Sequence, residues 1–196
     1  MKHIAITGGI GSGKSYVCRI LEKKGVAVYD CDSAAKRLWA TDDSLRQRLK
    51  QVVGENVYEG KVLRKDVLAN FLLESDDNKL TIDNVIHPAI ARDFLRSGLA
   101  WLESAILFDS GFDKRVKFDY IVCVSAPMET RLERVMKRDG ISRDKAMEWI
   151  ARQWSQDRVE SLCDFVIVND GKQDLDRQVS QIIADIDKNN TTKAQE

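Results

Sequence analysis

The segment from Gly8 to Ser15 constrains this chain more than any other stretch. It reads Gly-Gly-Ile-Gly-Ser-Gly-Lys-Ser and fits the phosphate-loop pattern G-x-x-x-x-G-K-[ST] at every position. The apolar residues 3–7 before it predict a buried strand, and apolar side chains recur at helical spacing from Val17 to Leu21. We therefore expect a strand, a glycine loop and a helix whose backbone N–H groups surround an anion.

The pattern also assigns chemistry to individual residues. Lys14 would reach the β- and γ-phosphates of a nucleoside triphosphate, and the Ser15 hydroxyl would bind Mg²⁺. The competing interpretation is a glycine-rich turn that happens to precede a lysine, and the flanking strand and helix argue against it. The other residues of the expected nucleotide site are Gly8, Gly11, Ser12, Gly13 and Tyr16.

Composition and charge narrow the class of protein. The 31 basic and 31 acidic residues cancel, which argues against nucleic-acid binding through bulk charge and leaves room only for a local basic patch. No apolar run approaches the roughly 18 residues of a membrane span, and no charged-then-apolar leader opens the sequence, so we expect a cytoplasmic protein without a membrane partner. The four cysteines lack C-x-x-C spacing, which favours reduced thiols over a metal cluster. No pattern indicates an oligomeric state.

The order of apolar segments predicts a three-layer α/β/α fold with a five-stranded parallel sheet, of the phosphate-loop NTPase type. The expected strands are residues 3–7, 26–29, 104–109, 120–124 and 164–168. The long helical stretch between the second and third strands exceeds a simple crossover and predicts an inserted helical lobe. The expected division is a nucleotide-binding core of 1–32, 103–130 and 164–187, an acceptor-binding insertion of 33–102, a lid of 131–163 and a disordered tail of 188–196.

Two carboxylates follow the second expected strand. Asp30 and Asp32 come where α/β proteins place their ligands, at the carboxyl end of a strand next to the glycine loop. Because side chains alternate along a strand, both can project to the same side. The alternative is a strand-to-helix turn in which Asp32 or Ser33 caps the helix. The two interpretations are compatible.

Two further features have functional and structural interpretations. His87-Pro88 predicts the start of a helix with Pro88 at its first position, and a lone His is more often a packing or capping residue than a catalyst. Asp109 ends the expected strand 104–109 and would supply an acid near Mg²⁺, or would be a plain exposed carboxylate at a strand end.

Arg131, Arg134 and Arg138 share one face of a helix expected after the fourth strand, with Gly140 placed to cap it. Such a charge run is often only a solvated face. After the fourth strand of a phosphate-loop protein, however, it favours a lid that folds over the triphosphate and stabilises the charge on the transferred phosphoryl group.

The ordered set of motifs resembles the dephospho-coenzyme A kinase family over residues 1 to about 171. The loop is extended by Thr7, Asp30-Cys31-Asp32 is similar to that family's D-x-D, and His87-Pro88 to its H-P pair. Further matches are the strand Ile106-Leu107-Phe108 before an acid, the lid residues Arg138-Asp139-Gly140 and Gln153, and the closing turn Val168-Asn169-Asp170-Gly171.

The resemblance implies transfer of the ATP γ-phosphoryl group to the 3′-hydroxyl of dephospho-coenzyme A, the last step of coenzyme A synthesis. It implies that Asp32 accepts or orients the hydroxyl proton and that Arg138 closes on the triphosphate. Asn169 would lie near the adenine of ATP, and His87 and Phe108 would face the acceptor. The chain departs from the family at Asp109, where Glu is usual, and at Tyr16, where Thr is more frequent.

Two other functions compete with this one. A nucleoside or nucleotide monophosphate kinase would share the core and the lid but act on another acceptor. A switch or assembly ATPase would hydrolyse ATP to drive a change of conformation. The guanine-specifying pattern N-K-x-D is absent from the sequence, and a helical insertion with a lid suits a sequestered small acceptor.

Overall fold

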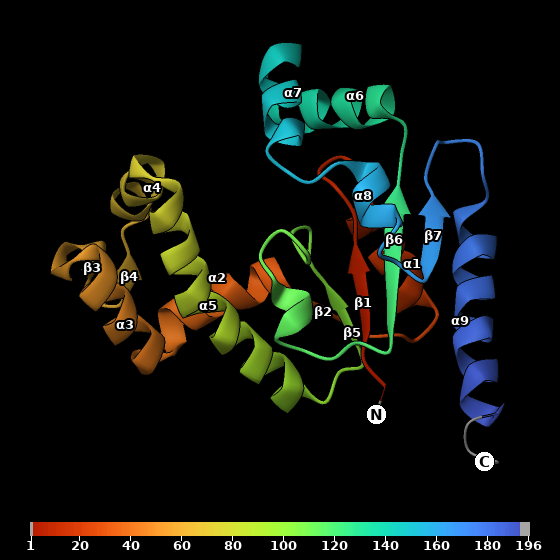
Figure 1. Cartoon of the computed structure of the whole chain (residues 1–196), viewed down its shortest axis with the longest axis horizontal. Coiled ribbons are helices and arrows are strands. Elements are labelled where there is room, and N and C mark those ends of the chain that lie inside the picture. Colours follow the sequence, from red (N-terminus) through yellow and green to blue (C-terminus); the bar gives the residue numbers. More distant parts are fainter. Residues whose placement is uncertain (1, 193–196) are drawn as a thin grey trace.

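A computed structural model describes the backbone of residues 2–192 and the side chains of residues 2–188. Its centre is a five-stranded sheet in which every neighbouring pair is parallel, in the order β2-β5-β1-β6-β7 (Figure 1). The strands are β1 (Ile4–Thr7), β2 (Val28–Asp30), β5 (Trp101–Glu103), β6 (Tyr120–Ser125) and β7 (Phe165–Val168). This confirms the expected parallel α/β/α architecture.

Alternation along β1 divides the apolar core between the two faces of the sheet. Ala5 belongs to a cluster on one face that includes residues of α5 (Asp76–Ser97), whereas Ile4 and Ile6 pack on the other face against α1 (Lys14–Lys23) and α9 (Leu175–Thr192). Helices cover both faces of the sheet, so every residue of β1 is buried and its sequence is almost continuously apolar, which is typical of strands in parallel sheets. The helix pattern from Val17 to Leu21 is thereby explained, since both side chains are buried against this sheet.

The helical insertion extends to one side of the sheet, at the left of Figure 1. It contains a helical turn at Glu55–Val57 and a small antiparallel hairpin of β3 (Tyr58–Glu59) and β4 (Val62–Leu63). Its helices are α2 (Cys31–Thr41), α3 (Asp43–Val53), α4 (Lys65–Glu74) and α5, which contacts the other three. The second half of α5 joins the insertion to the core, because Phe94 lies edge-on to the ring of Tyr29 in β2.

A pair of helices stands over the carboxyl end of the sheet, at the top of Figure 1. These are α6 (Met128–Asp139), which ends at Gly140 in the left-handed conformation, and α7 (Arg143–Ala151), which Ser142 caps. The short helix α8 (Gln156–Glu160) returns the chain to β6. The expected pair of short helices joined by a glycine turn is therefore confirmed as structure.

The third strand lies earlier than the sequence predicted. The strand is Trp101–Glu103, not 104–109, and residues 105–110 form turns in which Ser110 N donates to Ile106 O. Two apolar runs compete here, and the run that pairs with β1 is the one beginning at Trp101. The second run, residues 104–109, lies mostly in turns. Its Leu107 is nevertheless buried in the core, while Ile106 is partly exposed, so burial of this run does not require a strand.

Three smaller expectations also change. β2 begins at Val28 rather than residue 26. Pro88 lies inside α5 instead of starting a helix, since Ile86 and Ala89 on either side of it are buried in the core and maintain the helix through the loss of one backbone donor. The backbone of α9 runs to Thr192, past the predicted start of a disordered tail at residue 188, and residues 193–196 of that tail lie outside the described part. No helix within residues 2–192 is both long and apolar enough to cross a membrane.

Candidate active site

The glycine loop connects β1 to α1 in the conformation that its residue pattern requires. Gly13 precedes the first helical residue with φ of 95°, a region that glycine enters without strain. A Cβ atom on Gly13 would lie 2.1 Å from Nδ2 of Asn169, so close approach also demands glycine here. The N-terminus of α1 is thus presented at the carboxyl end of the sheet, where free N–H groups and the helix dipole favour an anion.

Lys14 and Glu103 form a buried pair beside this loop. The ammonium group of Lys14 donates to Gly8 O at 2.7 Å and lies 3.8 Å from Oε1 of Glu103. Burial lowers the pKa of Lys14, and the carboxylates of Glu103 and Asp32 oppose that shift. Burial likewise raises the pKa of Glu103, and Lys14 opposes it. Each charge therefore compensates the desolvation of the other.

Glu103 is the acid that the sequence interpretation missed. It ends β5, the strand between β2 and β1, which is the position that Asp109 was expected to hold. Asp109 instead accepts a hydrogen bond from the backbone N–H of Trp154 at 3.2 Å, at the end of the lid. The signal that could have located Glu103 is the apolar run immediately before it, Ala100-Trp101-Leu102.

The two carboxylates at the end of β2 and the start of α2 have different surroundings. Asp30 caps α2, because its Oδ1 accepts the N–H groups of Asp32 and Ser33 at 2.9 and 3.0 Å. The cap is therefore Asp30, and neither of the two residues proposed for that task, Asp32 or Ser33, performs it. Asp32 lies exposed in the first turn of α2, where its carboxylate accepts no hydrogen bond from any described side chain or backbone group.

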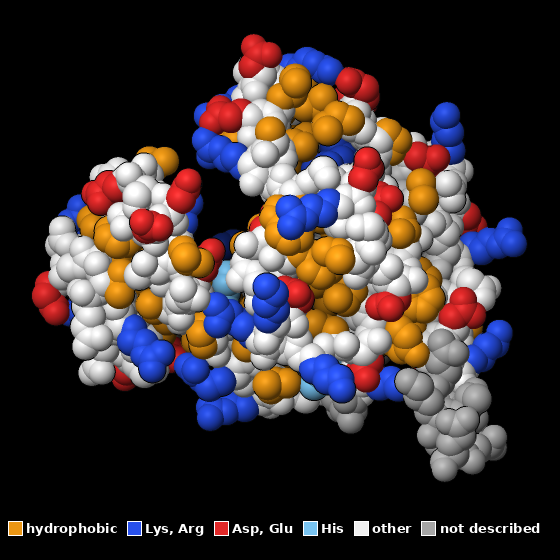
Figure 2. Space-filling view, viewed as in Figure 1, with side chains coloured by type: hydrophobic (Ala, Val, Ile, Leu, Met, Phe, Trp, Pro, Cys, Tyr) orange, Lys and Arg blue, Asp and Glu red, His pale blue; other side chains and the backbone are white. Residues whose placement is uncertain are grey.

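Residues from several separate segments line one central hollow of about 420 Å³. Lys14 and Ser15 come from the start of α1, Asp32 from the start of α2, and Arg138 from the end of α6. The central hollow is also lined by Ile10, Gly11, Gly13, Asp30, Glu103, Ala105, Arg134, Val135 and Gln153. In Figure 2 a notch separates the insertion from the core and the lid. Three expected catalytic residues, far apart in sequence, therefore meet around one space.

Arg138 differs from the other two arginines of α6, Arg131 and Arg134, in being exposed. Its guanidinium pairs with the adjacent Asp139, Nη2 to Oδ2 at 2.7 Å, and this hydrogen bond raises the pKa of Arg138 above its usual value. A pair between neighbouring exposed residues contributes little to stability. Arg138 is therefore a cation that lines the central hollow and that no described residue of the core holds in place.

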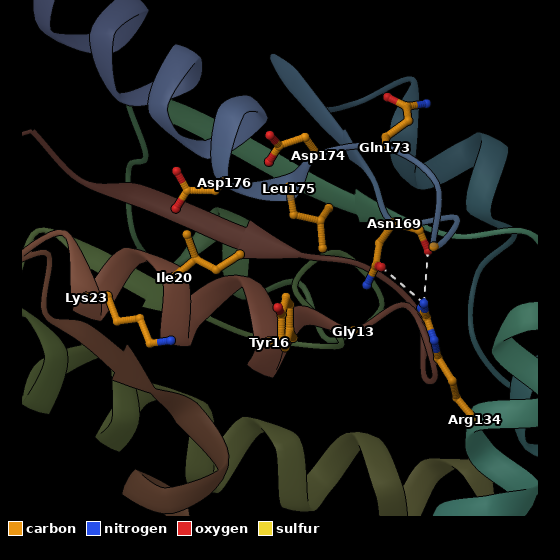
Figure 3. A pocket seen from close by; sticks show the side chains of 11 residues that line it. Gly13, Tyr16, Ile20, Lys23, Arg134, Asn169, Gln173, Asp174, Leu175 and Asp176 are labelled. Carbon is orange, nitrogen blue, oxygen red and sulfur yellow. Dashed lines mark hydrogen bonds between the residues drawn. The ribbon is translucent and has the colours of Figure 1, made fainter.

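A second pocket of about 620 Å³ lies on the other side of the loop, between α1 and the segment that leads into α9 (Figure 3). Tyr16, Ile20 and Leu175 give it apolar surface, while Asn169 and Arg134 stand at one end. The side-chain amide of Asn169 donates to Ser12 O at 2.8 Å, and its Oδ1 accepts from Arg134 at 3.1 Å. We call this space the Tyr16 pocket.

His87 lines a smaller, mainly apolar pocket of about 230 Å³ next to Asp32. We call it the His87 pocket, and Ile82 and Phe112 are among its other lining residues. Phe108, which was expected on the same side, does not line it. Its ring instead stacks on Trp154 with 6.3 Å between centroids and 9° between planes. The structure therefore brings His87, but not Phe108, beside Asp32.

The buried imidazole of His87 predicts a specific loss of stability in acid. Burial and the charge of Arg115 lower its pKa from 6.5 to about 4, while Asp83 lies 3.7 Å from Nε2. Between these values the unfolded chain binds a proton that the folded chain does not, so stability present above pH 6.5 is lost as the pH falls towards 4. Relative to His87→Leu, wild type should lose about 1–3 kcal/mol between pH 7 and 4.5.

Urea unfolding of both proteins at the two pH values measures this difference. The comparison isolates His87, because Asp83, whose pKa burial raises, is present in both proteins. An unchanged difference in unfolding free energy between pH 7 and pH 4.5 would show that the imidazole titrates normally in the folded state.

Comparison with known proteins agrees with this geometry. The family model of dephospho-CoA kinase matches residues 2–174. A dephospho-CoA kinase of Bacteroides fragilis is 40% identical over 188 residues, covering 92% of this chain and 91% of its own. One of Porphyromonas gingivalis is 42% identical over 192 residues, with 92% of each chain covered. The chain belongs to the dephospho-CoA kinase family.

Solved structures support the same assignment. A dephospho-CoA kinase from Campylobacter jejuni superposes with a TM-score of 0.64 at 25% identity and covers 97% of this chain and 100% of its own. A Thermus thermophilus protein gives a TM-score of 0.79 at 28% identity, covering 93% of this chain and 96% of its own. A shikimate kinase from Bacteroides thetaiotaomicron, with a TM-score of 0.57 at 13% identity, shares the fold. The chain is accordingly a kinase built on the phosphate-loop fold.

Proposed function

We propose that this chain transfers the γ-phosphoryl group of ATP to the 3′-hydroxyl of dephospho-CoA at the central hollow, the final step of coenzyme A biosynthesis. Family membership supports the reaction. The observation that supports its location is the meeting of Lys14, Ser15, Asp32 and Arg138 around one space. That set combines an anion-binding helix start, a carboxylate without a hydrogen-bond partner among the described residues and an exposed cation, which are the parts that phosphoryl transfer requires.

Asp32 is the proposed acceptor of the hydroxyl proton. Its carboxylate faces the central hollow and has no hydrogen-bond partner within residues 2–188, so both oxygens are available to a substrate hydroxyl. Asp30 already caps α2, so Asp32 is not required to hold the helix. Lys14, which lines the same hollow, would bind the β- and γ-phosphates and give up its present bond to Gly8 O.

A magnesium ion fits the residues at this position. Ser15 is exposed at the start of α1, and no described group of three His, Cys, Asp or Glu residues forms a metal site by itself. Mg²⁺ usually keeps several waters and binds one or two protein oxygens together with substrate phosphates, which suits a lone serine hydroxyl. When bound, the ion would neutralise charge on the phosphates, and Ser15 would hold it there.

The adenosine part of ATP is proposed to occupy the Tyr16 pocket. This pocket opens beside Gly13, and its apolar wall of Tyr16, Ile20 and Leu175 suits a planar base or a ribose (Figure 3). Asn169 stands at the end of this pocket nearest the loop, and its proposed place is near the adenine. The acceptor would enter from the insertion side, where the His87 pocket adjoins Asp32.

Acceptor-dependent release of ADP tests the proposed function. Purified protein with ATP and Mg²⁺ should release ADP rapidly only when dephospho-CoA is added, and nucleosides or nucleoside monophosphates should give no comparable rate. Strong stimulation by one of those other acceptors would keep the kinase core and contradict the proposed substrate. Release that no acceptor stimulates would favour a switch that hydrolyses ATP.

A further inference from the structure

The three arginines of α6 differ sharply in their surroundings, although they share one face of the helix. Arg131 is 2% exposed, and its Nε donates to Ile10 O at 2.9 Å. Arg134 donates to Gly11 O and Ser12 O at 3.3 and 3.2 Å. Arg138 makes no bond to the loop. The first two arginines therefore hold carbonyl groups of the glycine loop, whereas the third pairs with the adjacent Asp139.

The geometry of the peptide group links these hydrogen bonds to the direction of the loop N–H groups that would bind phosphate. The C=O of one residue and the N–H of the next belong to one planar trans group and point in opposite directions. When Arg131 draws Ile10 O towards α6, the N–H of Gly11 is turned away from α6. Ser12 O, held by both Arg134 and Asn169, does the same for the N–H of Gly13. Neither of these N–H groups has an acceptor within the described residues.

Ile10 is held from its other side as well. Its N–H donates to Oε1 of Gln153 at 2.7 Å, and the Nε2 of Gln153 lies 3.5 Å from Ala105 O. The side chain of Ile10 packs against the apolar cluster of the lid, which contains Leu132, Val135, Ala146 and Ile150. The tip of the loop is thus bound by both of its backbone groups and by its side chain to the lid, so its orientation depends on the lid.

We propose that Arg131 and Gln153 are positioning residues that clamp Ile10 and thereby aim the N–H of Gly11 at the phosphates of ATP. They act through the loop backbone and not by touching the nucleotide. The inference rests on the proposed function in that the loop must bind a nucleotide phosphate. It divides the arginine face of α6 into residues that shape the anion site and one, Arg138, that remains for the transferred group.

Gln153 is the residue to change, because it is neutral and its loss alters no charge beside the phosphates. Gln153→Met keeps the length of the side chain and removes its two polar contacts. Gln156→Met is the matched control, since Gln156 is also half-buried and makes two hydrogen bonds, to Ala126 N and the Ser125 hydroxyl at the end of β6. The measurements are ADP affinity by calorimetry and the amide resonance of Gly11 by NMR.

Gln153→Met should weaken ADP binding by about five- to tenfold, the usual value of one lost hydrogen bond, and should shift the Gly11 resonance before ADP is added. Gln156→Met should change ADP affinity by less than about twofold, because its contacts do not reach the loop. Equal ADP affinities in the two variants, or an unshifted Gly11 resonance, would overturn the clamp. Wild-type protein that binds no ADP would instead contradict the proposed function, and this result differs from the one that would overturn the clamp alone.

A second pair of variants tests whether the two residues act on one target. Arg131→Lys keeps the charge but replaces the planar guanidinium by a single ammonium group, so it should also weaken ADP binding. Because both residues hold Ile10, the double variant with Gln153→Met should lose less affinity than the product of the two single losses. Fully independent losses would show that Arg131 and Gln153 serve separate parts of the site.

Discussion

Replacement of Asp32 by Asn is expected to lower kcat by about 10²–10⁴-fold, the contribution of a general base, while the Kd for ATP changes by less than about threefold. Asparagine fills the same space but cannot accept a proton from the acceptor hydroxyl. The fold should survive, because the helix cap belongs to Asp30 and the backbone N–H of residue 32 still donates to it. Steady-state turnover and calorimetric ATP binding give the two quantities.

Asp43→Asn is the matched control for this variant. Asp43 occupies the first turn of α3 as Asp32 occupies the first turn of α2, and it is exposed, with a surface pair to Arg46. Its replacement should leave kcat unchanged, since it lies outside the central hollow. If Asp32→Asn retained turnover within about tenfold of wild type, Asp32 would have no role in proton transfer.

Replacement of Arg138 by Ala is expected to lower kcat by about 10²–10³-fold with little change in the Kd for ATP. Arg138 lines the central hollow, and among residues 2–188 its one ion-pair partner is the neighbouring Asp139. It can therefore move onto the transferred phosphoryl group when the lid closes. An interaction made mainly in the transition state affects kcat rather than ground-state binding.

Arg143→Ala controls for general effects on the lid. Arg143 is an exposed arginine at the start of α7 and pairs with Glu129 of α6 at 2.7 Å. Its loss should leave kcat within about twofold, because exposed pairs contribute little. An Arg138→Ala effect confined to KM would make Arg138 an ordinary binding residue and would remove it from the proposed transition-state role.

The parts of the fold that could be predicted are those marked by a short stretch of sequence, through its apolar periodicity and its end residues. The glycine loop, the strands on either side of the lid and the lid helices all combine strong periodicity with clear ends, such as Gly140 and Ser142. The strand at Trp101 was misplaced because two apolar runs lie next to each other, and pairing with β1, a tertiary interaction, decides between them. Pro88 was misjudged for a similar reason, since tertiary packing maintains α5 through it.

Within the candidate site, residue types and motif order located Lys14, Ser15, Asp32 and Arg138, which line the central hollow. Glu103 was missed because it depended on the misplaced strand. The clamp on Ile10 could not be predicted from spacing, because its partners lie 121 and 143 residues away in sequence. The hydrogen bonds of Arg131 and Gln153 go to backbone groups of Ile10, and every residue type has the same backbone carbonyl group, so the residue type at position 10 does not indicate them. The charge on one face of the helix drew attention to the three arginines, and only the structure distinguishes their surroundings.

The position of the new phosphate on the product is the most direct test of this account. Dephospho-CoA, ATP and Mg²⁺ are incubated with the protein, and the product is examined by ³¹P NMR and mass spectrometry. The account predicts one new phosphomonoester on the ribose 3′-oxygen for each ATP converted to ADP. Phosphate on another position, or ATP consumed without any phosphorylated dephospho-CoA, would contradict it.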